Sequence, residues 1–213
     1  MKTLTSKFKP IALIKLSFLL LLPAFCVALH VAAQTGDTVK LKQESFSNYS
    51  DLREKQKKAG IDKLIYKNFT FSFSVAIPNW LNLKETGSDD QWGGTLPPID
   101  GIENAIMIKA FPKSAFKSFS EFETIYLTGN KFGQPAKYDS QHTWYGQHEL
   151  IPIAHGVKQK VFLVWQKKIY DNMFVLLETK SAYLWIQFVA TRETYDRNIS
   201  KFDEFMAGVN LME

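Results

Sequence analysis

Between Lys158 and Met206 the chain reads KQKVFLVWQKKIYDNMFVLLETKSAYLWIQFVATRETYDRNISKFDEFM. Three apolar runs follow one another in it: Val161–Tyr170, Met173–Thr179 and Ala182–Thr191. The connections at 171–172 and 180–181 are too short for a crossover, so we expect neighbouring antiparallel strands. The even-numbered residues from Ala182 to Ala190 are all apolar, which predicts a strand that lies on a core.

A helical pattern follows the third run. Apolar residues recur there at the spacing of one helical stripe, at Tyr195, Ile199, Phe202 and Met206. Thr191 is placed to cap this helix with its hydroxyl, and Gly208 is placed to end it in a left-handed conformation. Because strands here do not alternate with helices, the order of elements favours an α+β fold over a parallel α/β fold.

Earlier segments predict further elements. The residues FTFSFSVAI at Phe69–Ile77 alternate apolar and small side chains, which predicts a strand that ends at Pro78. Ser118 and Glu121 form a capping box in front of a helical pattern. The other expected elements are a surface helix over 47–58, a helix over 119–128, and strands over 105–111 and 143–153.

The first 33 residues have the features of a secretory signal. They contain four lysines and no acid, an apolar run from Leu16 to Val31, and a small pair at Ala32-Ala33. We predict cleavage after Ala33, and an uncleaved anchor is the alternative. The apolar run is shorter than the ~20 residues of a membrane-spanning helix, so we expect no stable membrane span after cleavage. The protein is therefore expected to be exported, to the periplasm or out of the cell.

Cleavage would change the charge and the cysteine count. The whole chain has 26 Lys and Arg against 21 Asp and Glu, and four of the lysines leave with the signal. The 22 basic side chains that remain give a net charge of only +1, so we expect no nucleic-acid partner. Cys26 leaves as well, and the bulky Phe25 before it argues against a lipidated cysteine. The exported chain would then have no disulfide and no thiolate.

The remaining length suits one domain. We assign 1–33 to the signal peptide, 34–60 to a polar lead-in and surface helix, and 61–213 to a single α+β domain.

Two segments carry a family resemblance, namely YKNFTFSFSVAIPNWL at Tyr66–Leu81 and YLWIQFVATRETYDRNISKFDEFM at Tyr183–Met206. An aromatic strand that ends in Pro78 and Trp80, and a closing strand that feeds a final helix, resemble the PsbP-like family. That family is similar to the Ran-binding nuclear import protein and to bacterial periplasmic relatives. The resemblance implies an αβα sandwich in which helices cover an antiparallel sheet, used as a docking or assembly module. The chain has no recognisable photosystem-binding arm, so no photosynthetic role and no functional residue follows.

The sequence contains no recognisable catalytic constellation, and we expect a non-enzymatic protein. It has no G-x-S-x-G elbow and no phosphate-binding glycine loop. On an extended segment His142 and His148 would stand ~20 Å apart, too far to share a metal ligated at ~2 Å. The spacing of acids from Asp89 to Asp100 only partly follows that of a calcium loop. We therefore expect no metal site and no cofactor.

The segment 84–104 is the longest expected loop. Loops longer than ~12 to 15 residues in compact domains tend to be functional. Trp92 could anchor a protein partner in the cell envelope, with Asp89 and Asp90 beside it. The alternative is that Trp92 folds back over the sheet. Trp144 and Tyr145 are further candidate contacts, because adjacent strand positions face opposite sides of a sheet.

A second hypothesis is a small-molecule carrier or hydrolase. It requires an apolar cavity between the sheet and the helices, with a few convergent polar groups. The residues expected to line such a cavity are Phe71, Phe73, Trp165 and Trp185.

Overall fold

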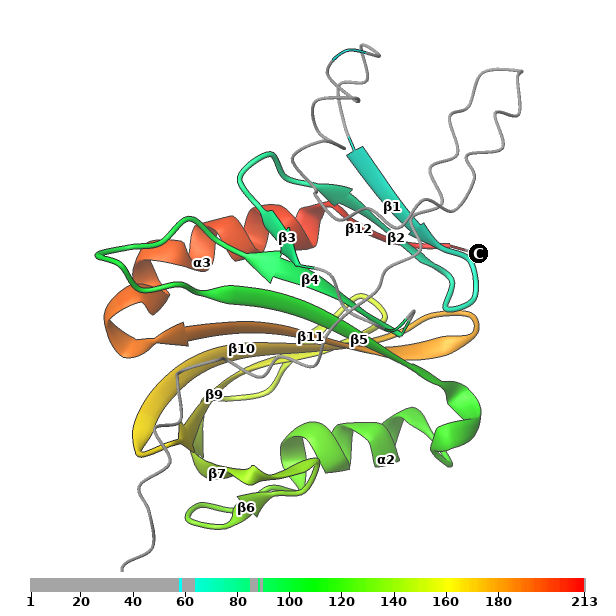
Figure 1. The fold of residues 1–213 in the computed structure, drawn as a ribbon. Coiled ribbons are helices and arrows are strands. Elements are labelled where there is room, and N and C mark those ends of the chain that lie inside the picture. Colours follow the sequence, from blue (N-terminus) through cyan, green and yellow to red (C-terminus); the bar gives the residue numbers. More distant parts are fainter. Residues whose placement is uncertain (1–57, 59–63, 85–87, 89, 213) are drawn as a thin grey trace, which may run out of the picture.

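Most strands of the protein join one antiparallel sheet, seen in a computed structural model that describes residues 58, 64–84, 88 and 90–212 (Figure 1). The strand order of this nine-stranded sheet is β3-β4-β5-β11-β10-β9-β7-β6, with β8 also paired to β9. Its strands are β3 Asn82–Lys84, β4 Gln91–Thr95, β5 Ala105–Pro112, β6 Pro135–Ala136, β7 Asp139–Gln147, β8 Ile151–Ile153, β9 Gly156–Trp165, β10 Lys168–Glu178 and β11 Ala182–Thr191.

A smaller antiparallel sheet has the order β1-β2-β12, with β1 Leu64–Asn68, β2 Phe73–Ile77 and β12 Val209–Leu211. The helices are the 3₁₀ turn η1 Lys113–Ala115, α2 Phe119–Glu123, the π-helical turn η2 Thr124–Thr128 and α3 Arg192–Ala207. Antiparallel sheets with separate helices confirm the expected α+β class. The signal peptide, the lead-in and the helix expected over 47–58 lie, apart from Lys58, outside the described residues.

The expected meander of three strands is confirmed, since β9, β10 and β11 pair in antiparallel order. The turn expected at Asp171-Asn172 is wrong. Both residues are buried inside β10, where Asp171 forms an ion pair with Lys160. The chain instead turns at Gln166 and Lys167, which both have positive φ as a tight hairpin requires. Local residue preference misplaced the turn, because the ion pair with Lys160 keeps the buried aspartate in the strand.

The strand expected over 69–77 is shorter than its sequence pattern. Residues 69–72 form a turn, with Ser72 at φ 55°, and only Phe73–Ile77 belong to β2. The alternating aromatic residues therefore run across a hairpin turn, and β1 supplies the partner of β2. A period of two does not reveal a turn when the turn residues keep the same alternation.

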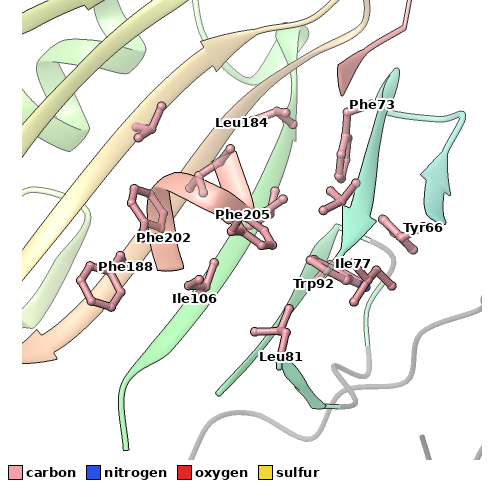
Figure 2. Close-up of a cluster of buried hydrophobic side chains, with 14 of the residues drawn as sticks. Tyr66, Phe73, Ile77, Leu81, Trp92, Ile106, Leu184, Phe188, Phe202 and Phe205 are labelled. Carbon is pink, nitrogen blue, oxygen red and sulfur yellow. The ribbon is translucent and has the colours of Figure 1, made fainter. Parts of the chain in front are cut away.

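Two hydrophobic clusters lie on opposite faces of the large sheet. On β11 the side chains of Leu184, Ile186 and Phe188 enter one cluster, while Tyr183 and Trp185 enter the other. The first, called the α3 cluster, includes Phe202 and Phe205 of α3 and side chains of β1–β5 (Figure 2). The second, called the α2 cluster, includes Phe122 of α2 and Tyr126 and Leu127 of η2. In Figure 1 the two helices lie on opposite sides of the sheet.

The helix caps predicted from the sequence are only partly observed. Ser118 caps α2 as expected, because its Oγ accepts a hydrogen bond from the backbone N–H of Glu121 at 3.2 Å. Thr191 stands at the N-cap of α3 but makes no side-chain capping bond to the backbone. Gly208 ends α3 with φ −89°, so the expected left-handed cap is wrong. A Cβ at Gly208 would lie 2.8 Å from the carbonyl oxygen of Ala76, so close approach to β2 explains this glycine.

Candidate functional site

Trp92, the expected docking anchor, is a core residue. It lies in β4, is 1% exposed, and stacks between Tyr66 and Phe205 at centroid distances of 5.2 and 5.9 Å (Figure 2). The expectation of an irregular loop throughout 84–104 is wrong for residues 91–95. Gly93 allows β4 to approach β5 closely, because a Cβ at this residue would overlap the carbonyl oxygen of Ile106. Trp92 is thus buried within a strand of the sheet, rather than in a loop that folds back over the sheet.

Of the two acids beside Trp92, the structure describes only Asp90. Asp90 is half-buried, and its backbone carbonyl accepts a hydrogen bond from the N–H of Ala110 at 2.7 Å. Its carboxylate accepts a hydrogen bond from Ser88. Asp89 lies outside the described residues.

Trp144 and Tyr145 face different environments, as their adjacent positions require. Trp144 is 1% exposed in the α2 cluster, and its indole donates to Gln147 Oε1 at 2.6 Å. Tyr145 is 44% exposed. The pairing of β7 with β9 shifts register between Trp144 and Gly146, so Tyr145 is the extra residue of a β-bulge. Gly146 permits this shift with φ 155°, and the bulge directs the tyrosine to the surface.

Phe132 is the partner of Tyr145 that the sequence did not predict. Its side chain is 70% exposed, and the two ring centroids lie 5.4 Å apart. Phe132 is a single aromatic residue in a polar loop, so no periodicity marked it. Its neighbours Gly133 and Pro135 marked only a loop.

The loop that carries Phe132 is fastened at both ends. The N–H of Gly133 donates to the carbonyl of Trp144, and the N–H of Trp144 donates to the carbonyl of Gln134. Asn130 is 7% exposed and donates through Nδ2 to the carbonyls of Ile125 and Leu127. Its Oδ1 accepts from the N–H of Lys137 at 2.8 Å. The phenylalanine is therefore presented by a loop with several fixed hydrogen bonds.

A histidine and an acid also meet on this side of the protein. His142 Nδ1 lies 2.7 Å from Asp139 Oδ2, and the His142 ring stacks on Trp165 at 5.9 Å. His148 packs on Phe162 and His155 occupies an exposed turn. Within the described ranges, no group of three His, Cys, Asp or Glu side chains is arranged to hold a metal ion.

A buried ion pair lies on the other face of the sheet. The Asp171 side chain is 7% exposed; Lys160 Nζ is 3.1 Å from its Oδ2, and Arg192 Nε is 3.7 Å from its Oδ1. Lys160 Nζ also lies 3.7 Å from the ring centre of Tyr195. Burial, with the carboxylate of Asp171 as a second cause, raises the pKa of the Tyr195 phenol. These contacts join β9 and β10 to the start of α3, which is a structural role.

The four residues expected to line an apolar cavity do not lie together. Phe71 and Phe73 belong to the α3 cluster, whereas Trp185 belongs to the α2 cluster on the opposite face. Trp165 contacts His142 and Tyr170 near the end of β9. The cavity proposed from the sequence therefore cannot form from this set.

In the part of the chain that the structure describes, no helix has the length and apolar character needed to span a membrane.

No known protein-family model matches the chain, and no curated protein is similar to it. Several solved structures overlap with it loosely, among them the following three. A Pseudomonas aeruginosa protein of unknown function, PA94, has 12% identity and a TM-score of 0.41, covering 68% of this chain and 93% of its own. Cyanobacterial PsbP from Synechocystis has 10% identity and a TM-score of 0.42, and the overlap covers 70% of this chain and 92% of PsbP. A protein from Bacteroides thetaiotaomicron has 12% identity and a TM-score of 0.41, and the overlap covers 70% of this chain and 48% of that protein. Overlap at this level carries no conclusion about activity.

Proposed function

We propose that this protein is an exported, non-enzymatic binding module of the cell envelope that docks a protein partner through Phe132 and Tyr145. The observation that carries the proposal is the paired exposure of these two rings, 70% and 44%, at a centroid distance of 5.4 Å. Large aromatic side chains are enriched at the energetic centres of protein interfaces. Export to the envelope rests on the signal-like sequence of residues 1–33.

Preorganisation of the two rings supports this role. Tyr145 is directed outward by the β-bulge, and Phe132 by a loop that is hydrogen bonded to Trp144 and Asn130. Fixing interface side chains before binding reduces the entropy lost on association. A bulge that only relieved strain would not need an aromatic residue at its exposed position.

The surroundings of the pair indicate the chemistry of the partner. Lys131 and Lys137, close to Phe132 in the sequence, are both exposed. A complementary surface would have an apolar pocket for the rings and acidic side chains at its rim. We further propose that the fold is the PsbP-like αβα sandwich implied by the sequence resemblance, with α2 and α3 as its outer layers.

The test is site-specific photo-crosslinking in the envelope of the source cell. A photoreactive amino acid at Tyr145 should crosslink one protein reproducibly, while the same group at Phe69 should not. Phe69 is a matched control because it is 65% exposed and lies in the turn before β2. The crosslinked protein, purified, should bind the wild-type chain and bind a Phe132→Ser, Tyr145→Ser variant at least tenfold more weakly.

Two results would contradict the proposal. Binding of the purified partner that is unchanged in the double variant would show that the rings are not the docking surface. A crosslink formed only between two copies of this chain would show that the surface mediates self-association instead. A Phe69→Ser variant should bind as the wild type does, which controls for a general loss of exposed aromatic area.

A further inference from the structure

A side-chain hydrogen bond crosses the bulge that exposes Tyr145. The indole Nε1 of Trp144 donates to Gln147 Oε1 at 2.6 Å, and these two residues stand on either side of Tyr145 and Gly146 in β7. Trp144 lies in the α2 cluster, whereas Gln147 is exposed. The bond therefore ties the surface end of the bulge to a buried ring.

A bulge of this kind has competing registers. Trp144 pairs with Leu163 and Gly146 pairs with Phe162, so Tyr145 has no residue opposite it on β9. If the unpaired position moved back by one residue, Tyr145 would lie opposite Leu163, where the side chain of β7 points into the α2 cluster. The direction of Tyr145 thus depends on what holds the unpaired position in place.

Backbone hydrogen bonds hold both ends of the bulge. Before it, the N–H of Trp144 donates to the carbonyl of Gln134 at 2.9 Å, and the carbonyl of Trp144 accepts from the N–H of Gly133 at 2.8 Å. After it, the N–H of His148 donates to the carbonyl of Lys160 at 2.8 Å. The side-chain bond links the two ends across the segment between them.

Burial of the indole makes its acceptor important. Trp144 is 1% exposed, so water has little access to its N–H. An indole N–H can only donate, and a buried donor that loses its acceptor costs free energy. A shift of the bulge would move the indole relative to Gln147. The bond therefore favours the register in which Tyr145 points outward.

We propose that Gln147 is a positioning residue of the docking surface. Its Oε1 holds the Trp144 indole and thereby keeps Tyr145 directed outward, beside Phe132. The value of this arrangement for binding a partner rests on the proposed function, whereas the effect of Gln147 on the direction of Tyr145 does not. Because Gln147 acts through the indole, another side chain that places an acceptor oxygen there should preserve the effect.

Two substitutions separate the acceptor from the bulk of the side chain. Gln147→Met removes the acceptor oxygen and keeps the length of the side chain, whereas Gln147→Glu keeps an acceptor oxygen. In NMR spectra of the whole chain, the Trp144 indole N–H should exchange with solvent about threefold to tenfold faster in Gln147→Met, the effect of losing one neutral hydrogen bond.

The contact between the two exposed rings is the decisive measurement. The ring centroids of Phe132 and Tyr145 lie 5.4 Å apart, so nuclear Overhauser effects should join them in the wild type. These effects should weaken in Gln147→Met and return in Gln147→Glu. A glutamine that only satisfied the indole would leave the contact between the rings unchanged.

Gln141→Met is the matched control, because Gln141 is an exposed glutamine of the same strand and its backbone N–H donates to Asp139. It should change neither measurement. Ring contacts that are unchanged in Gln147→Met, or lost equally in Gln147→Met and Gln147→Glu, overturn the proposal. Thermal melting checks that each variant folds, and Gln147→Thr, whose side chain is too short to reach the indole, replaces Gln147→Met if that variant does not.

Binding of the purified partner separates the positioning of Tyr145 from docking. Loss of the ring contacts together with weaker binding in Gln147→Met supports both. Loss of the ring contacts with unchanged binding supports the positioning role of Gln147 and contradicts docking through Phe132 and Tyr145.

Discussion

The Nζ of Lys160 on β9 lies 3.7 Å from the centre of the Tyr195 ring on α3. The same ammonium group lies 3.1 Å from the carboxylate of Asp171 on β10. One cation therefore links the first turn of the last helix to the two strands beneath it. The Asp171 carboxylate is buried, and a buried charge is tolerated only when its partners are present, so the cluster should be sensitive to loss of any one member.

Replacing Lys160 with Met should destabilise the protein by about 2–4 kcal/mol, because it leaves the Asp171 carboxylate buried without its nearest cation. Urea denaturation monitored by circular dichroism measures the change. Lys180→Met is the control, since Lys180 is exposed in the β10–β11 turn and its loss should cost under about 0.5 kcal/mol. Equal stabilities of the two variants would show that the ion pair contributes nothing to folding.

Stability should fall at alkaline pH. Burial raises the pKa of Tyr126 to about 12 and also raises the pKa of Tyr195 above its usual value near 10. The folded state favours the neutral phenols, so their contribution is complete below pH 10 and is lost as the pH rises through 12. Melting temperatures between pH 8 and 12 test this. Tyr126→Phe should show a shallower decline above pH 10, and an identical decline would contradict the assignment to Tyr126.

Substitution of Trp92 should lower the stability of the protein, whereas substitution of Tyr145 should weaken binding of the partner. Trp92→Ala should cost about 3–5 kcal/mol of folding free energy, because it empties the space between Tyr66 and Phe205. Tyr145→Ala should change stability by under about 0.5 kcal/mol while weakening the partner's binding. Denaturation and calorimetry on the same samples separate the two effects. A stable Trp92→Ala protein would return Trp92 to the list of docking candidates.

Asn130→Asp should weaken docking without altering either exposed ring. The substitution replaces the amide donor to the carbonyls of Ile125 and Leu127 with a carboxylate oxygen, which repels them. The expected cost is about 2–3 kcal/mol of stability, and Phe132 should become more mobile. NMR relaxation of the Phe132 amide measures the mobility. Asn210→Asp is the control, because Asn210 is exposed and its Nδ2 bonds only the carbonyl of Gly208; equal mobility of Phe132 in both variants would contradict the role of Asn130.

Periodic segments were predicted well because burial imposes their pattern. β11 and α3 lie at Ala182–Thr191 and Arg192–Ala207, as the alternation and the helical spacing required. Segments that depend on long-range partners were predicted poorly. Asp171 was placed in a turn because its preference for turns is local, whereas its ion pair with Lys160 is set by strand register.

The candidate site also depends partly on local sequence pattern and partly on long-range strand pairing. The sequence predicted that one of Trp144 and Tyr145 faces away from the core, but it did not predict which one. Their exposure depends on the bulge opposite β9, and a single inserted residue reverses which side chain faces the core. Trp92 was placed in a loop because its neighbours are acids and glycines. In the structure it lies in a strand, because its segment pairs with β5.

Amino-acid order alone determined that this chain forms amphipathic strands and a closing helix, because the contrast between apolar and polar side chains has a local period. Tertiary structure alone decided which aromatic residues reach solvent and where the bulge of β7 falls. Those outcomes depend on register between strands that are distant in the chain, and a shift of one residue would exchange the two faces of the sheet.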